Sequence, residues 1–189
     1  NKNGYERLKY YLSLVDKNEI LAFQYNQPQF HIKQKIKFQI YYENEYTKED
    51  LFDYFKILPE SDVRYSEQIC SGIIFFKNNK RSRNFLKQWD EVCNISNLID
   101  DTPSAKQNSE KFIEHRHDQS AFSILCKINN IVCLSASECE WAEDEKGRYW
   151  DHLINYPILA KRDKKTNILK RFFLRQIKNF NRILKKCKI

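Results

Sequence analysis

The sequence predicts an α/β layered domain over residues 1–160 and a separate basic tail over residues 161–189. Two observations support the domain. Segments with apolar residues at helical spacing alternate with short apolar runs that suit strands. In addition, 189 residues are enough for one domain with a single sizeable core.

The first part of the chain begins with an amphipathic helix over residues 4–17. Its apolar residues fall on one helical face: Tyr5, Leu8, Leu12 and Val15. Residues 19–25 form a short apolar run typical of a strand. Between residues 30 and 40 the apolar residues keep period two, which predicts an exposed strand or hairpin. The stretch Thr47-Lys48-Glu49-Asp50 has the form of a capping box and predicts a helix that continues to Pro59.

The middle of the chain contains the most apolar stretch. Residues 69–76 are nearly all apolar, as in a strand buried on both faces. A second amphipathic helix is predicted from Ser82 or Arg83 to Cys93. The residues 100–104 (Asp-Asp-Thr-Pro-Ser) then predict a turn.

The last part of the predicted domain contains a third helix, residues 118–128. Asp118 or Ser120 is expected to cap it, with a side-chain oxygen accepting from the first-turn N–H groups. Residues 131–134 follow as a short strand, and residues 135–156 are expected to be irregular.

The net charge of +8 is unevenly distributed. Residues 161–189 hold twelve basic residues and one acidic residue, whereas residues 1–160 carry a net charge of −3. This pattern argues against a nucleic-acid-binding body. Apolar residues recur every three to four positions in the tail, which predicts an amphipathic helix lying on an anionic membrane surface; the alternative is a helix docked on the body.

The cysteines and apolar runs exclude several classes of protein. The six cysteines show no zinc-like spacing and are expected to be small buried hydrophobes in a reducing compartment. Three glycines are too few for a glycine-rich phosphate loop. No apolar run reaches the roughly 18 residues that a membrane-spanning helix needs.

The most chemically dense stretch is Glu114-His115-Arg116-His117-Asp118-Gln119-Ser120. It precedes a predicted helix, and a helix start favours negative charge because its N–H groups are unpaired. One alternative is that the stretch is a well-capped surface helix whose charges have no further role.

Several segments resemble a known family when taken together and in order. They are Gly4, Arg7-Leu8 and Tyr11-Leu12; residues 20–24; Glu43, Tyr46-Thr47-Lys48 and Asp50-Leu51-Phe52; Gln68 and Ser71-Gly72-Ile73; Trp89; residues 98–101 and Pro103-Ser104; residues 112–120; and Tyr156-Pro157-Ile158, Ala160 and Arg162. The family is that of the GT-A-fold glycosyltransferase-like proteins of bacterial surface-polysaccharide (capsule or lipopolysaccharide) loci. The strand-like stretch 26–42 departs from the pattern as an insertion.

The resemblance implies a GT-A-like mixed sheet flanked by helices, of which this sequence is the C-terminal portion. The absence of methionine also indicates that the reading frame is incomplete. The resemblance further implies that the carboxylates holding Mn²⁺ or Mg²⁺ lie upstream of Asn1. The expected activity is transfer of a sugar from a nucleotide-sugar donor to a surface glycan or glycolipid acceptor, at the inner face of the cell membrane.

The resemblance also implies roles for residues of this sequence. Asp118 is the expected catalytic residue, contacting the donor sugar or acting as base towards the acceptor hydroxyl. Gln119 would bind sugar hydroxyls, and Arg116 or His117 would offset the diphosphate charge. The remaining substrate-binding candidates are His115, Glu43, Gln68, Asp100 and Asp101, and His152 is a weak candidate metal ligand.

Two other function classes remain open at this point. His115, His117 and Asp118 are residue types that metal-dependent hydrolases use as ligands, although no further cluster of matching spacing follows. The protein could instead bind carbohydrate without catalysis. For Asp100 and Asp101, the simpler interpretation is a turn, because aspartate stabilises turns routinely.

Overall fold

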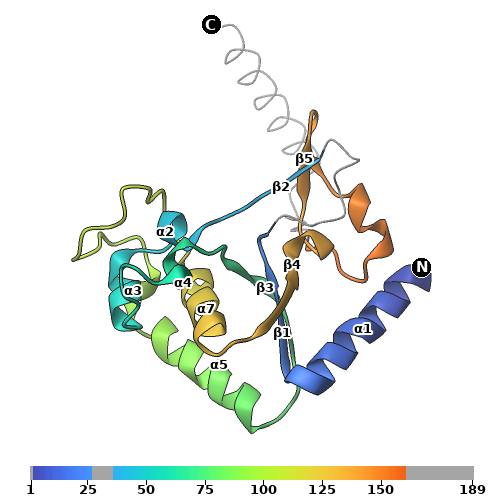
Figure 1. Cartoon of the computed structure of the whole chain (residues 1–189), viewed down its shortest axis with the longest axis horizontal. Coiled ribbons are helices and arrows are strands. Elements are labelled where there is room, and N and C mark those ends of the chain that lie inside the picture. The colour runs from blue at the N-terminus through green and yellow to red at the C-terminus, as the bar shows by residue number, and fades with distance from the viewer. Residues whose placement is uncertain (1, 27–35, 161–189) are drawn as a thin grey trace, which may run out of the picture.

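The computed structural model describes residues 2–26 and 36–160 of the chain (Figure 1). These residues form helices around two small sheets, so the predicted α/β class is confirmed. The tail, residues 161–189, lies outside the described residues, and its predicted amphipathic helix stays a prediction.

The larger sheet has the strand order β3-β1-β4. Its central strand β1 (Ile20–Gln24) is antiparallel to β3 (Ile69–Phe76) and parallel to β4 (Val132–Ser135). In the parallel pair, Leu21 lies opposite Val132 and Gln24 lies opposite Ser135. Because β1 and β4 run in the same direction and in register, their carboxyl ends meet at one edge of the sheet.

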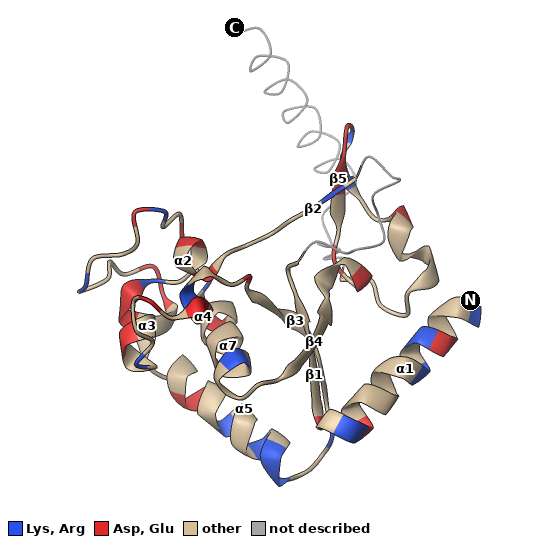
Figure 2. Ribbon diagram, in the orientation of Figure 1, with Lys and Arg blue, Asp and Glu red and all other residues tan. Residues whose placement is uncertain are grey.

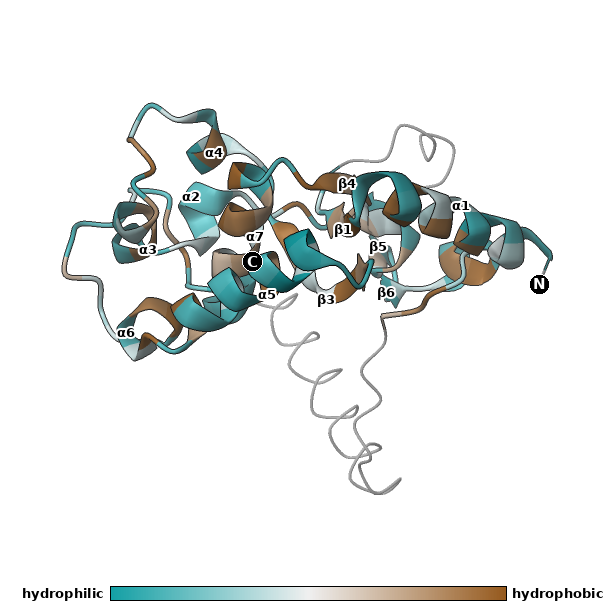
Figure 3. Cartoon of the chain, turned by 90° about the horizontal axis from the view of Figure 1, so that it is seen from below, coloured by the Kyte–Doolittle hydropathy of each residue, from teal (hydrophilic) through white to brown (hydrophobic). Residues whose placement is uncertain are grey.

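Strand β1 is central because both of its faces are apolar. Leu21 and Phe23 pack in one cluster with Tyr11 of α1 (Lys2–Asn18). Ile20 and Ala22 pack in a second cluster that includes α7 (His117–Ile128). All four of these strand residues are completely buried, and Figure 3 shows the hydrophobic colouring of the strands between the helices. The predicted helix over 4–17 and the strand within 19–25 are therefore confirmed. The predicted apolar face of the helix was partly wrong, because Tyr5 and Leu12 are exposed and Tyr11 is buried.

Strand β3 has the predicted position but not the predicted environment. Only its first two residues, Ile69 and Cys70, are buried. The expectation of a strand buried on both faces was wrong because β3 is an edge strand of the three-stranded sheet.

Helix α5 (Lys80–Cys93) follows β3 and begins two or three residues earlier than predicted. Its N-cap is Asn79, whose side-chain oxygen accepts from the backbone N–H of Ser82 at 2.9 Å. Phe85 and Val92 bury its apolar side, and the short helix α6 (Ser96–Ile99) follows.

Three short helices lie between β2 (Lys37–Phe38) and β3 in the chain: α2 (Glu43–Tyr46), α3 (Glu49–Tyr54) and α4 (Asp62–Tyr65). The predicted capping box was wrong, because the N-cap of α3 is Lys48 and no side chain caps it. The Thr47 hydroxyl donates instead to Glu43 at 2.6 Å. Helix α3 also ends at Tyr54, before Pro59. Acidic residues colour α2 and α3 in Figure 2.

The second sheet contains short antiparallel strands in the order β2-β5-β6. They are β2 (Lys37–Phe38), β5 (Ala142–Asp144) and β6 (Gly147–Tyr149), and the one-turn helices η1 (Ala136–Glu138) and η2 (Asp151–Asn155) flank the hairpin. Of the stretch 30–40, residues 30–35 lie outside the described residues, and only β2 forms a strand in the rest. The expectation that 135–156 is irregular was wrong.

The described cysteines are all free: Cys70, Cys93, Cys126, Cys133 and Cys139. Burial raises the pKa of the Cys133 thiol to about 12, in agreement with the expected role as a small hydrophobe. In the described part of the chain, no helix combines the length and apolarity required to cross a membrane.

Candidate functional site

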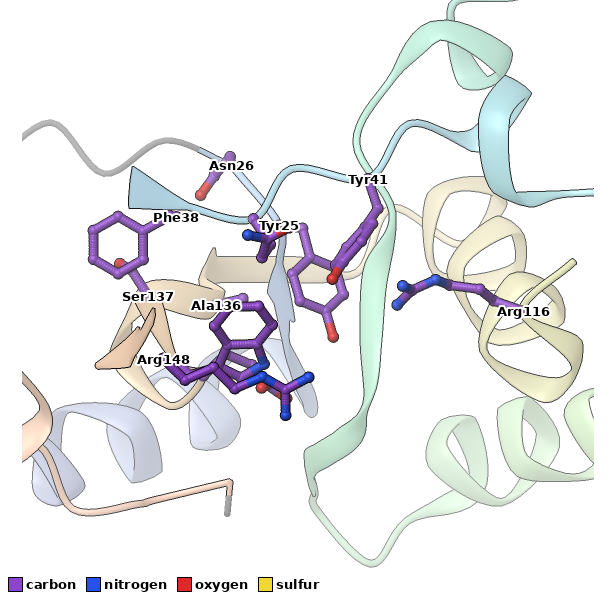
Figure 4. A pocket seen from close by; sticks show the side chains of 11 residues that line it. Tyr25, Asn26, Phe38, Tyr41, Arg116, Ala136, Ser137 and Arg148 are labelled. Atoms are coloured by element: carbon purple, nitrogen blue, oxygen red, sulfur yellow. The ribbon is translucent and has the colours of Figure 1, made fainter. Parts of the chain in front are cut away.

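Two adjoining cavities lie where β1 and β4 end, between the larger sheet and the β5–β6 hairpin (Figure 4). Their volumes are about 220 and about 650 Å³, and small-molecule sites commonly enclose about 300–1,000 Å³. Five residues line both cavities, so we treat the two together as one cleft: Tyr25, Arg116, Glu140, Trp141 and Arg148.

Aromatic rings form much of the cleft wall. Tyr25 follows directly on β1, and its ring meets that of Tyr41 edge to face, with the centroids 4.8 Å apart. Trp141 precedes β5, and Trp150 follows β6 and lines the larger cavity. The wall therefore combines side chains from the end of β1, the segment after β2 and the hairpin.

Two guanidinium groups reach into the cleft from different elements. The guanidinium carbon of Arg116, the residue before α7, lies 3.6 Å from the centroid of the Tyr41 ring and 4.9 Å from that of Tyr46. The guanidinium carbon of Arg148, on β6, lies 4.4 Å from the centroid of the Trp141 ring. Such contacts orient a guanidinium and leave its N–H donors free for other partners.

Glu140 is the one acidic residue of the described chain that lines either cavity. Its Oε1 lies 3.6 Å from Sγ of Cys70, at the start of β3. Burial raises the pKa of both the Cys70 thiol and the Tyr25 hydroxyl. Around neutral pH, the thiol and the phenol at this side of the cleft therefore stay protonated.

The structure separates the members of the block 114–120. Arg116 lines both cavities, and Gln119 lines the larger one, where its Nε2 donates to Oε1 of Gln68 at 3.1 Å. Asp118 lines neither cavity and is exposed. The indole N–H of Trp89 on α5 donates to the Asp118 carbonyl oxygen at 3.1 Å, so Asp118 lies on the α5 side of α7.

The expected capping of α7 by Asp118 or Ser120 was wrong. The N-cap position is occupied by Arg116, and no side chain caps the helix. The Ser120 hydroxyl accepts from the Arg116 backbone N–H at 3.3 Å and donates to the Tyr46 carbonyl oxygen at 2.8 Å. Ser120 therefore joins α7 to α2.

His115 is a buried structural residue with both ring nitrogens engaged. Its Nδ1 accepts from the backbone N–H of Lys48 at 3.3 Å, and its Nε2 lies 2.8 Å from the Leu98 carbonyl oxygen, to which it donates. Burial lowers the pKa of His115 to about 4. Neither nitrogen can bind a metal or a substrate while these hydrogen bonds persist.

His117 and the two aspartates form a separate group at the surface. Nε2 of His117 lies 2.8 Å from Oδ1 of Asp101, whose side chain is 88 % exposed. Asp100 accepts from the backbone N–H of Thr102 at 3.0 Å, which is the predicted turn geometry. None of the three lines the cleft.

Glu43 and Gln68 belong to a buried polar network and are both completely inaccessible. The Glu43 carboxylate accepts from Thr47, Gln68 and Ser123 and pairs with Nζ of Lys127 at 2.6 Å. This network joins α2, β3 and α7 behind the cleft. Glu43 therefore has a structural role. Gln68 does not line the cleft, but it accepts a hydrogen bond from Gln119, which does.

The described residues do not fit a divalent cation. His152 is packed between Tyr149 and Phe38, and its Nε2 lies 3.1 Å from the Glu140 carbonyl oxygen. No group of three or more metal-ligating side chains forms within residues 2–26 and 36–160. The cleft itself offers two guanidinium groups and one carboxylate, whereas Mg²⁺ and Mn²⁺ require several oxygen ligands. The hydrolase alternative therefore finds no supporting ligand set here.

Most cleft residues carry no local sequence signal. Tyr25, Tyr41, Glu140, Trp141 and Arg148 come from four separate segments, and only the fold brings them together. The concentration of aromatic and acidic residues in 135–156 was the one available indication.

Comparison of the chain with family models, with curated proteins and with solved structures finds no match in any of the three.

Proposed function

We propose that the protein is a glycosyltransferase of the GT-A class that binds its sugar in the cleft and transfers it from a nucleotide-sugar donor to a surface glycan or glycolipid. The observation that carries this proposal is the position of the cleft at the carboxyl ends of the parallel strands β1 and β4. In open α/β sheets, ligands bind at this edge.

The lining of the cleft supports a sugar as the ligand. Indole and phenol rings offer apolar faces on which the C–H faces of a sugar ring can stack. Gln119 supplies an amide close to those rings, and an amide can donate to and accept from hydroxyl groups.

In this proposal Glu140 takes the role that the sequence suggested for Asp118. The acceptor hydroxyl loses its proton to the Glu140 carboxylate while its oxygen attacks the anomeric carbon. The bond from that carbon to the donor diphosphate breaks, and the diphosphate leaves with the bonding electron pair. Glu140 is favoured because it lines both cavities.

The experiment is a donor screen with the protein at its natural full length. The protein is incubated with uridine, guanosine, cytidine and thymidine diphosphate sugars in the presence of Mn²⁺ or Mg²⁺, and release of nucleoside diphosphate is measured. We expect release with at least one donor and its loss in Trp141→Ala. Tyr5→Ala, an exposed aromatic on α1, is the matched control.

Carbohydrate binding without catalysis is the second candidate. It is favoured by the same aromatic and arginine lining, which can hold a sugar without any further group. Saccharide binding in the cleft with no release from any donor would establish this second function. Absence of both binding and release would refute the two proposals together.

A further inference from the structure

The two cleft arginines differ from the other described arginines in what holds them. The guanidinium groups of Arg7, Arg64 and Arg81 bind the carboxylates of Glu138, Glu49 and Glu19, and that of Arg83 binds the Asn78 amide. Arg116 and Arg148 lie against aromatic rings, as Arg7 and Arg64 also do, but without such a close carboxylate or amide partner in the described part of the chain. Both side chains line the cleft, and the one ion pair that they form with the described part of the chain is the long contact of Arg116 with Glu114.

The contacts of Arg116 are consistent with this difference. Its nearest carboxylate is Glu114, with a separation of 3.8 Å between Nη2 and Oε1. Its Nε is buried and has no hydrogen-bond partner among the described residues. A buried N–H without a partner is costly.

Arg148 has its cation–π contact with Trp141 and no ion pair in the described part of the chain. Figure 4 shows its side chain and that of Arg116 approaching the cleft from opposite sides. With Glu140 as the acidic neighbour, the charged groups that line the cleft within the described chain sum to a positive value.

We propose that the cleft selects an acidic saccharide, whose carboxylate or sugar phosphate is bound by Arg116 and Arg148. This inference rests on the proposed carbohydrate function and names the substrate class of the same site. The guanidinium fork matches the two oxygens of a carboxylate or phosphate.

The spacing of rings and charges favours an oxyanion on the sugar itself. The guanidinium carbon of Arg148 is 4.4 Å from the centre of the Trp141 ring, so a stacking surface and an anion-binding group are adjacent. An acidic sugar has the same arrangement, because its anionic group is attached to the ring or to the carbon beside it.

The test compares acidic sugars with neutral ones. Binding of glucuronate, galacturonate, N-acetylneuraminate and glucose 6-phosphate to the full chain is measured by calorimetry and by ligand-observed NMR, with glucose and galactose as the neutral counterparts. We expect at least one acidic probe to bind about tenfold or more tightly than its neutral counterpart, with affinity falling as salt rises.

Substitutions locate the binding. Arg148→Gln, at an exposed position, and Arg116→Gln should each weaken the acidic probe about tenfold or more and leave the neutral sugar unchanged. Arg83→Gln, on the exposed side of α5, removes the same charge away from the cleft and should change nothing. Melting temperatures show whether each variant folds. If Arg116→Gln does not fold, Arg148→Gln alone tests the inference.

The result that would overturn the inference is equal affinity for acidic and neutral sugars, or no binding of any acidic probe. Binding of pyrophosphate alone would also overturn it, by assigning the arginines to a diphosphate. Selective acidic binding without donor turnover would leave this inference standing and refute only the transferase. Turnover of neutral and acidic donors at equal rates would support the transferase and refute the selection of an acidic saccharide.

Discussion

Nε2 of His115 lies 2.8 Å from the carbonyl oxygen of Leu98, and this contact joins the start of α7 to α6. The ring must be neutral, because its Nδ1 accepts a hydrogen bond from Lys48. Protonation would replace that acceptor with a second N–H inside a buried site. The folded structure therefore disfavours the charged form.

This contact predicts a loss of stability in mild acid. Burial lowers the pKa of His115 from 6.5 to about 4; Lys48 and His117 also lower it, and the bond to Leu98 and the charge of Asp101 oppose the shift. The unfolded state thus binds the proton first as pH falls. The contribution of neutral His115 to the free energy of unfolding is complete above pH 6.5. It is lost as pH falls towards 4, by about 3 kcal/mol in total.

Urea unfolding at pH 7 and pH 4.5 measures this effect. His115→Gln should reduce the difference in unfolding free energy between the two pH values, because the titrating group is gone. His117→Gln, which removes a surface imidazole, is the control and should keep most of the difference. An unchanged difference in His115→Gln would assign the acid sensitivity to other groups.

The buried pair of Glu43 and Lys127 predicts a strong coupling. Nζ of Lys127 lies 2.6 Å from the Glu43 carboxylate, and the two side chains are 10 % and 0 % exposed. Lys127→Met leaves a buried carboxylate without its counter-ion and should cost about 3–5 kcal/mol. The double variant Glu43→Gln/Lys127→Met should recover much of that loss, whereas additive costs in a double-mutant cycle would disprove the coupling.

The regular elements were predictable because their burial follows the period of the backbone. The helical spacing of Tyr5, Leu8, Leu12 and Val15 indicated α1, and the bounded apolar run of β1 indicated a strand. The predicted face of the helix was only partly right, because Tyr11 and Val15 are buried whereas Tyr5 and Leu12 are exposed. The errors have a different origin. Thr47 has the sequence context of a helix cap, but the buried carboxylate of Glu43 takes its hydroxyl.

The cleft was not predictable for the same kind of reason. Arg116 and Gln119 were indicated by the dense block at the start of α7. Tyr25 and Arg148, by contrast, belong to segments more than one hundred positions apart, and they meet only because β1 and β4 pair in parallel ahead of the hairpin. A pattern within a short stretch of sequence cannot predict contacts between residues so far apart in the chain.

The tail, whose residues lie outside the described structure, supports a prediction from charge alone. Residues 161–189 carry twelve basic residues and one acid, and each basic residue near an anionic membrane adds about 1 kcal/mol of attraction. The protein should float with vesicles that contain phosphatidylglycerol and not with pure phosphatidylcholine vesicles. Deleting 163–189 should abolish flotation; equal binding to both vesicle types would contradict an electrostatic anchor.

Asp118 and Glu140 provide the sharpest comparison between sequence and structure. Asp118 is exposed on the α5 side of α7, whereas Glu140 lines both cavities. If Glu140 takes the proton of the acceptor, Glu140→Gln should lower kcat on the order of 10²-fold or more. Asp118→Asn should leave kcat within about twofold, because a surface substitution away from the site removes no contact with the substrate.

Nucleoside diphosphate release and melting temperature are measured for both variants and the wild type. Glu140→Gln keeps the size and shape of the side chain, so its melting temperature should stay close to that of the wild type. The loss should appear in kcat more than in KM, because the base acts chiefly in the transition state. The reverse pattern, a slow Asp118→Asn enzyme and an active Glu140→Gln enzyme, would return the catalytic role to the start of α7 and move the reaction out of the cleft.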